Sequence, residues 1–137
     1  MGGVVIEVQE LIELAKIARE KAYVPYSKFK VGAALLSANG TVYLGCNIEN
    51  AAYSPTNCAE RTAIFKAVSE GERAFKALAV VADSEQIITP CGVCRQVLAE
   101  FIDDDTMIYL ANMQGDMCQV TISELLPKAF RGEDYGL

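Results

Sequence analysis

Three cysteines lie in two short runs of the chain whose spacing is typical of a metal site. Cys58 opens the run Cys-Ala-Glu-Arg, and Cys91 and Cys94 belong to the run Pro-Cys-Gly-Val-Cys-Arg at 90–95. Two residues between two thiols let both sulfurs reach one ion from the first turn of a helix, and Cys58 offers a third ligand. We therefore expect Cys58, Cys91 and Cys94 to hold Zn²⁺ and to leave its fourth position open to water.

Glu60, two residues after Cys58, is the candidate for proton transfer beside this metal. The chain contains no histidine, which removes Ser-His and Cys-His nucleophilic arrangements and histidine metal ligands together. A carboxylate, Lys, Tyr or Cys must then serve as general acid or base. Glu60 could instead only cap a helix, but next to three thiols we favour the catalytic interpretation.

Several residues near the cysteines could influence the metal, and two other interpretations of the cysteines have to be weighed. Three thiolates on a doubly charged ion leave one excess negative charge, which Arg61 could offset by donating to a thiolate. Gln96 and Arg95 are further candidates for the surroundings of the metal. A redox Cys-x-x-Cys has the same spacing, so a thiol oxidoreductase is a competing interpretation. Cys46 or Cys118 could also close a structural four-cysteine site, although neither has ligand spacing to another cysteine.

The elements that must position these residues alternate between helical and extended patterns. Apolar residues with helical spacing, short apolar runs and the turn signal Asn39-Gly40 predict the following elements: helices at 5–22, 58–70, 91–102 and 124–126, and strands at 29–37, 42–46, 75–82, 107–111 and 119–122. This order predicts an α/β fold, a three-layer α-β-α sandwich around a mixed five-stranded sheet, formed as a single domain over residues 1–137.

Both candidate metal-binding runs lie at the predicted start of a helix. Asn57 is the expected N-cap of the helix at 58–70, with Glu60 three residues later, and Pro90 precedes the helix at 91–102. The positive ends of two helices would then favour the ionised, metal-binding form of the thiols. Ser123 is the expected cap of the short last helix.

The composition is that of an ordinary globular protein. The chain has 137 residues, 52% of them hydrophobic and 22% charged, with a net charge of -6. Such a charge disfavours nucleic acid and anionic membranes as partners, and no apolar run is long enough to span a membrane. The opening residues lack a signal-peptide pattern, and Ile6 does not fit N-myristoylation. Five cysteines without a secretory signal favour a reducing, cytoplasmic location.

Long stretches of the sequence resemble the small homotetrameric zinc-dependent cytidine deaminases. Zinc deaminases carry His/Cys-x-Glu followed by Pro-Cys-x-x-Cys, and both parts are present here. The resemblance extends over nearly the whole chain, through residues 23–36, 45–71, 90–101 and 124–130.

The resemblance implies hydrolytic deamination of cytidine and deoxycytidine to uridine and deoxyuridine, as in pyrimidine salvage, with one Zn²⁺ per subunit. Glu60 would accept a proton from the attacking water and pass it to N3 and to the leaving amino group. The amide of Ala59 would hold the base carbonyl. Phe29 would stack on the base, although it could equally be plain core. Asn47 and Glu49 would bind the ribose 3′-hydroxyl.

The resemblance also implies a homotetramer whose active sites are shared between subunits. Phe130 would enter the site of a neighbouring subunit, and Tyr53 would belong to the same network. The Glu49 carboxylate would repel a sugar phosphate, so the expected partner is a free nucleoside. Two alternatives stay open: a deaminase of another cytosine-containing nucleoside, and a non-catalytic module stabilised by zinc.

Overall fold

A computed structural model describes residues 6–137 of the chain. Its sheet has five strands in the order β2-β1-β3-β4-β5, and the chain runs through the elements in the following order: α1 (Val8–Arg19), β1 (Val31–Ser37), β2 (Val42–Cys46), α2 (Ala59–Ser69), β3 (Phe75–Ala82), α3 (Gly92–Phe101), β4 (Met107–Asn112), β5 (Met117–Val120), α4 (Ile122–Leu125) and the 3₁₀ helix η1 (Gly132–Tyr135).

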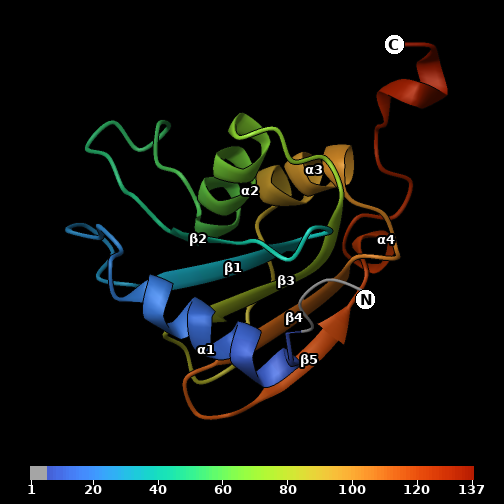
Figure 1. The fold of residues 1–137 in the computed structure, drawn as a ribbon. Helices are drawn as coiled ribbons and strands as arrows, with labels where there is room; N and C mark the ends of the chain where they lie inside the picture. The colour runs from blue at the N-terminus through green and yellow to red at the C-terminus, as the bar shows by residue number, and fades with distance from the viewer. Residues whose placement is uncertain (1–5) are drawn as a thin grey trace.

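The sheet is mixed, and helices cover both of its faces. β1 pairs antiparallel with β2 and with β3, β3 pairs parallel with β4, and β4 pairs antiparallel with β5. α1 lies on one face of the sheet, and α2 and α3 lie together on the other (Figure 1). The predicted three-layer arrangement with a mixed five-stranded sheet is therefore confirmed.

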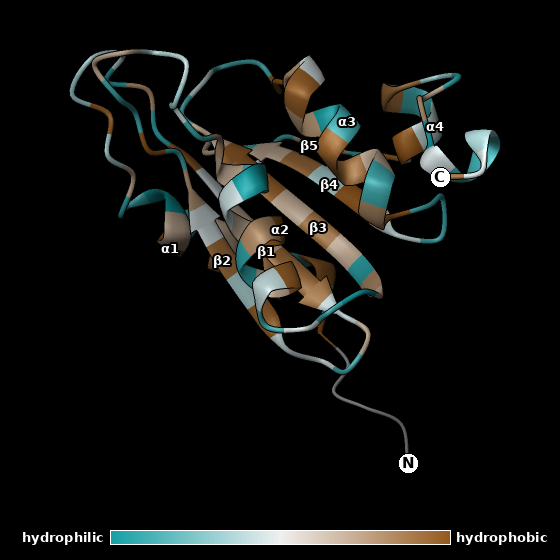
Figure 2. Cartoon of the chain, turned by 90° about the horizontal axis from the view of Figure 1, so that it is seen from above, coloured by the Kyte–Doolittle hydropathy of each residue, from teal (hydrophilic) through white to brown (hydrophobic). Residues whose placement is uncertain are grey.

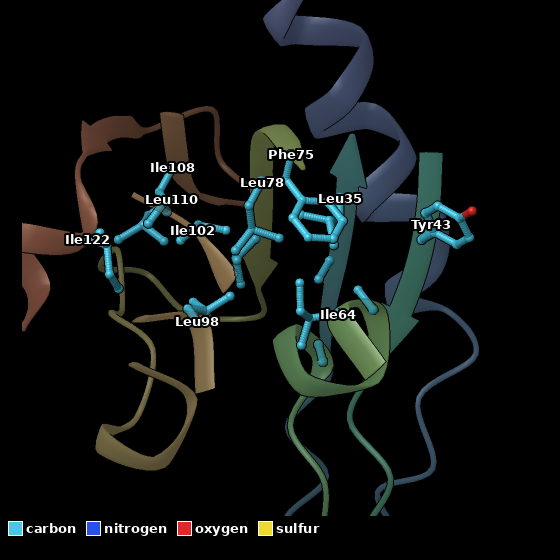
Figure 3. Close-up of a cluster of buried hydrophobic side chains, with 14 of the residues drawn as sticks. Leu35, Tyr43, Ile64, Phe75, Leu78, Leu98, Ile102, Ile108, Leu110 and Ile122 are labelled. Atoms are coloured by element: carbon cyan, nitrogen blue, oxygen red, sulfur yellow. The ribbon is translucent and has the colours of Figure 1, made fainter. Parts of the chain in front are cut away.

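The two faces of the central strands bury two separate apolar clusters. Successive side chains of a strand point to opposite faces, so Ala33 and Leu35 of β1 pack toward α2 and α3, whereas Ala34 and Leu36 pack toward α1. Figure 3 shows the larger cluster, in which Ile64 of α2 and Leu98 of α3 approach the strands, with β3 and β4 also contributing.

Burial on both faces explains why β1 and β3 read as continuous apolar runs. All seven residues of β1 are buried, whereas β2 alternates between buried and half-buried residues because it lies at the edge of the sheet. Apolar residues accordingly run along β1, β3 and β4, and hydrophilic residues occur on the helices and loops (Figure 2). No helix within residues 6–137 is long and apolar enough to cross a membrane.

Helix boundaries differ from the prediction at several points. α1 is shorter than the predicted 5–22, with its described bounds at Val8 and Arg19, and residue 5 lies outside the described residues. The interpretation of the opening residues as neither a signal peptide nor a myristoylation site also falls largely outside them. β5 begins two residues before the predicted strand and ends at Val120, and η1 was not predicted.

The predicted caps of two helices are wrong. Asn57 is still extended, because its amide and carbonyl both bond to Ile48, so Cys58 is the N-cap of α2. The last helix starts at Ile122 and not after Ser123. Thr121 caps it, because Thr121 and Glu124 form a reciprocal capping box.

Candidate metal centre and active site

The thiols of Cys58, Cys91 and Cys94 form one compact cluster, with all three sulfurs within 4.8 Å of one another. The sulfurs of Cys58 and Cys91 are 3.7 Å apart, and those of Cys91 and Cys94 are 3.4 Å apart. Tetrahedral Zn²⁺ with bonds of about 2.3 Å to sulfur holds two ligands roughly 3.8 Å apart. The spacing and chemistry of the three thiols therefore fit Zn²⁺.

Two helix starts bring these thiols together. Cys58 is the N-cap of α2, and Cys91 is the N-cap of α3, where its sulfur accepts the amide of Cys94 at 3.5 Å. Gly45 lets α2 approach β2, since a Cβ at this position would stand 2.4 Å from the carbonyl oxygen of Ala59. The exposed amides and positive ends of both helices favour thiolates at this point.

The thiols of Cys58 and Cys94 do not ionise equally. The hydrogen bond from Cys94, followed by those from Arg61 and Cys91, lowers the pKa of Cys58 to about 5 against the opposing effect of burial. The same contact with Cys58, together with burial, raises the pKa of Cys94 above its usual range. Arg61 donates from Nη2 to the Cys58 sulfur and to the Thr56 carbonyl, at 3.4 Å each. Cys58 therefore becomes a thiolate more readily than Cys94.

Glu60 lines the same cavity as Cys58 and Cys91. This cavity of about 220 Å³ is also lined by Phe29, Asn47, Cys58, Ala59 and Cys91. Glu60 is only 5% exposed, and burial, with a further contribution from the Cys58 charge, raises its pKa to about 7. The cavity is smaller than the ~300–1,000 Å³ of most ligand pockets, which suits a single heterocycle.

Asn47 and Phe29 form the wall where β1 begins. Asn47 donates from Nδ2 to the Phe29 carbonyl at 2.8 Å and accepts the Val31 amide on Oδ1 at 3.0 Å. Both polar ends of the amide group thus hold the chain that carries Phe29. The aromatic ring packs against the larger core cluster and also lines the cavity.

Glu49 lies beside a second cavity of about 330 Å³, lined also by Tyr26, Ser27 and Tyr53. Its carboxylate accepts the amides of Tyr26 and Ser27 at 3.1 Å each and the Ser27 hydroxyl. The Ser27 side chain is the main cause that lowers the pKa of Glu49. Tyr53 is 72% exposed, with a φ of 63°, and its ring meets Tyr26 edge-on at 6.3 Å between centroids.

Residues 6–111 match the family model for the cytidine and deoxycytidylate deaminase zinc-binding region, which is well over half of the chain. The chain belongs to this family.

Relatives in the family match the chain over nearly its whole length. The chain is 63% identical over 129 residues to a cytidine deaminase of Sporosarcina psychrophila, covering 94% of this chain and 95% of the relative. A cytidine deaminase of Halalkalibacterium halodurans is 61% identical over 126 residues, covering 92% and 96%. The crystal structure of cytidine deaminase from Burkholderia pseudomallei superposes with a TM-score of 0.89 at 52% identity, covering 91% of this chain and all of that one.

Within this deaminase fold, Gln96 lies elsewhere than the sequence suggested. It does not face the thiols but donates from Nε2 to the Phe130 carbonyl at 2.8 Å, so it holds the C-terminal segment. Phe130 is 58% exposed and stacks on Tyr135 with 4.9 Å between the ring centroids. The segment that carries Phe130 extends away from the sheet in Figure 1.

Three roles were missed from the sequence. Arg95 donates to Thr89 Oγ1 and the Pro90 carbonyl at 2.7 Å each and to the Leu125 carbonyl at 2.6 Å, which ties the turn before Cys91 to α4. Arg131 donates to the Ala99 carbonyl near the end of α3. Ser27 binds Glu49. No spacing rule predicts the contacts of Arg95 with Leu125, of Arg131 with Ala99 or of Ser27 with Glu49, because each joins segments distant in sequence.

The two remaining cysteines lie outside the metal cluster. Within residues 6–137, the cysteine group able to hold a metal contains neither Cys46 nor Cys118. Both are partly buried, and burial raises the pKa of the Cys46 thiol. A four-cysteine site is therefore not formed in the described structure.

Proposed function

We propose that this chain catalyses the hydrolytic deamination of cytidine and deoxycytidine, releasing ammonia and forming uridine and deoxyuridine. The observation that carries the proposal is the buried Glu60 carboxyl, which lines one small cavity together with Cys58 and Cys91. A pKa near 7 suits a group that must both accept and return a proton at neutral pH. Family membership and the cytidine deaminases among the relatives support the same substrate class.

The three thiols would hold the metal, and the chain supplies the rest of the chemistry. Zn²⁺ bound by three protein ligands retains a position for water and lowers the pKa of that water. Glu60 would accept one proton of the attacking water while the water oxygen bonds to C4 of the cytosine base. Glu60 would then deliver that proton to N3 of the base. It then transfers the second proton to the amino group, the bond from C4 to nitrogen breaks, and ammonia leaves.

Residues around the cavity would bind and orient the nucleoside. The amide of Ala59, at the first turn of α2, has no partner within its helix and would donate to the base carbonyl. Phe29 would stack on the base, with its backbone held by Asn47. Asn47 and Glu49 would contact the ribose, and the Glu49 charge would disfavour a phosphorylated sugar. Arg61 would offset the excess charge of the thiolates.

We also propose that active sites are shared within a homotetramer, with one Zn²⁺ per subunit. Phe130 and Tyr53 are large aromatic side chains left exposed on segments away from the sheet, which supports their use in a neighbouring subunit's site. The cytoplasm is the proposed compartment, because the function requires reduced thiols in all three metal ligands.

The test is zinc content measured together with cytidine and deoxycytidine turnover, in the wild type and in Glu60→Gln. We expect one zinc per chain in both proteins and a loss of activity of about 10²–10⁴-fold in the variant, because the amide cannot carry the proton. Glu100→Gln, an exposed site on α3, is the matched control and should retain full activity.

Other outcomes would point to other functions. An active wild type whose rate is unchanged by Glu60→Gln would remove Glu60 from its role. Zinc binding without turnover of either nucleoside would favour a zinc-stabilised module, and turnover only of another cytosine nucleoside would favour the alternative substrate. A reversible disulfide between Cys91 and Cys94 in place of zinc would indicate a thiol oxidoreductase.

A further inference from the structure

The carboxylate of Glu49 is already largely occupied by hydrogen bonds from its own chain. Oε1 accepts the amides of Tyr26 and Ser27 at 3.1 Å each, and Oε2 accepts the Ser27 hydroxyl. An ionised carboxylate offers about four acceptor positions, two on each oxygen. Three are taken, so one acceptor position remains, and it is on Oε2.

The direction of the Ser27 hydroxyl is also determined. Its oxygen accepts the Phe29 amide at 3.0 Å, so its single proton is available for Glu49. The intervening residue, Lys28, has a φ of 61° and donates its amide to the Val24 carbonyl at 3.0 Å. A left-handed conformation at a residue other than glycine is unfavourable and persists only where its surroundings hold it. The turn that presents Ser27 is therefore well defined.

We propose that Ser27 is a positioning residue for sugar recognition, because its hydroxyl fixes Glu49 so that one acceptor position receives one hydroxyl of the nucleoside sugar. This inference rests on the proposed function, in which Glu49 contacts the 3′-hydroxyl. With one position available, Glu49 reads one hydroxyl only. The contact is then the same for cytidine and deoxycytidine and is lost when the 3′-hydroxyl is absent.

The test compares two substrates that differ only at that hydroxyl, deoxycytidine and 2′,3′-dideoxycytidine, in the wild type, Ser27→Ala and Ser27→Thr. Ser27→Ala should lower kcat/KM for deoxycytidine about tenfold, mainly through KM, as expected for a lost hydrogen bond to a charged group. The value for 2′,3′-dideoxycytidine, measured with enzyme in excess, should change less than threefold. Ser27→Thr retains the hydroxyl and should keep the wild-type ratio between the substrates.

A double-mutant cycle with Glu49→Gln gives a second readout. It compares the effect of Ser27→Ala in the wild type with its effect in the Glu49→Gln variant. If Ser27 acts through Glu49, adding Ser27→Ala to Glu49→Gln should cause less than a further threefold loss on deoxycytidine. Equal losses on both nucleosides, or losses that multiply in the double variant, would overturn the inference while leaving the proposed function intact. A wild type that turns over neither cytidine nor deoxycytidine would overturn the proposed function and the inference with it.

Discussion

Glu60 and Arg61 are adjacent in sequence, but the surroundings of Glu60 favour a neutral carboxyl, whereas Arg61 favours a charged thiol at Cys58. The Glu60 carboxyl is buried against the cavity, and this burial disfavours its charged form. The Arg61 guanidinium donates to Cys58 and favours the charged form of that thiol. Both residues lie in the first turn of α2, where consecutive side chains point in different directions. The first turn of α2 thus presents a buried carboxyl and a guanidinium that favours the Cys58 thiolate.

The raised pKa of Glu60 predicts a pH-dependent stability in the metal-free protein. The folded value is about 7 against 4.5 for an unperturbed carboxyl, so the folded state binds this proton more tightly than the unfolded state. The protonated Glu60 carboxyl therefore stabilises the folded state fully below pH 4.5, and this stabilisation is lost as the pH rises to about 7. The free energy of unfolding of wild type, relative to Glu60→Gln, should therefore fall by about 3 kcal/mol across this window.

Urea unfolding of both chelator-treated proteins at pH 5 and pH 8 measures this difference. Comparing with Glu60→Gln isolates the titration of Glu60 together with its coupling to the charges of Cys58 and Cys94. A gap between the two proteins that stays constant with pH would show that Glu60 is not buried as described.

At the scale of the elements, close contact between α2 and β2 determines where the metal ligand on α2 lies. A Cβ on Gly45 would stand 2.4 Å from the Ala59 carbonyl oxygen and 2.5 Å from the Ala63 amide nitrogen. Side chains of α2 also bond outward-facing carbonyls of this edge strand, since Thr62 donates to Cys46 at 3.0 Å and Lys66 donates to Leu44. These contacts hold α2 against β2.

Gly45→Ala should therefore push α2 away from β2 and disturb the metal site. We expect a loss of about 1–3 kcal/mol in the free energy of unfolding, as for overpacking in a core, together with weaker zinc retention against a competing chelator. Gly92→Ala is the matched control, because a Cβ there meets no atom within 4 Å, and its unfolding free energy should stay within about 0.5 kcal/mol of wild type. Equal effects of the two substitutions would argue against this packing role.

At the scale of the whole molecule, the C-terminal segment is anchored on the helix that carries two metal ligands. Gln96 of α3 holds the Phe130 carbonyl at 2.8 Å, and Arg131 donates to Ala99 at the other end of that helix. The backbone of this segment is thus tied to its own subunit, while the Phe130 ring is exposed. Such an arrangement suits an aromatic side chain that completes a site on a second copy of the chain.

Mixing two impaired variants tests the proposed sharing of active sites. Phe130→Ala should lower turnover about tenfold or more, as for an aromatic anchor at an interface, and Glu60→Gln should lower it because the amide cannot carry the proton. Hybrid oligomers would contain sites with an intact Glu60 from one chain and an intact Phe130 from the other. Activity after mixing, unfolding and refolding should exceed the sum of the separate variants. Leu137→Ala, at an exposed terminal residue, is the control for Phe130.

If the mixture shows no more activity than its two components, each site would be complete within one subunit. The role proposed for Phe130 would then be wrong, while the proposed reaction would remain.

Much of the fold followed from local patterns, because burial imposes them directly on the sequence. Strands β1 and β3 are apolar except for Ser37 and Lys76 near one end, since both of their faces are covered. The Asn39-Gly40 turn marked the hairpin between β1 and β2. The metal ligands were also predictable, because two of them share one helical turn and the third opens another helix. The caps at Asn57 and Ser123 were predicted wrongly. Backbone pairing with Ile48 keeps Asn57 extended, and the capping box of Thr121 and Glu124 starts the last helix earlier.

The sequence by itself determined the three thiols, the neighbouring carboxyl and the order of the elements, since these depend on residue type and short spacing. Only the tertiary structure decided that Gln96 faces Phe130 and not the metal, and that Ser27 donates to Glu49. These contacts join segments 34 and 22 residues apart, and each depends on how the sheet and loops bring distant backbone together. Local spacing carries no record of such pairings, because many sequences with the same pattern could place those side chains elsewhere.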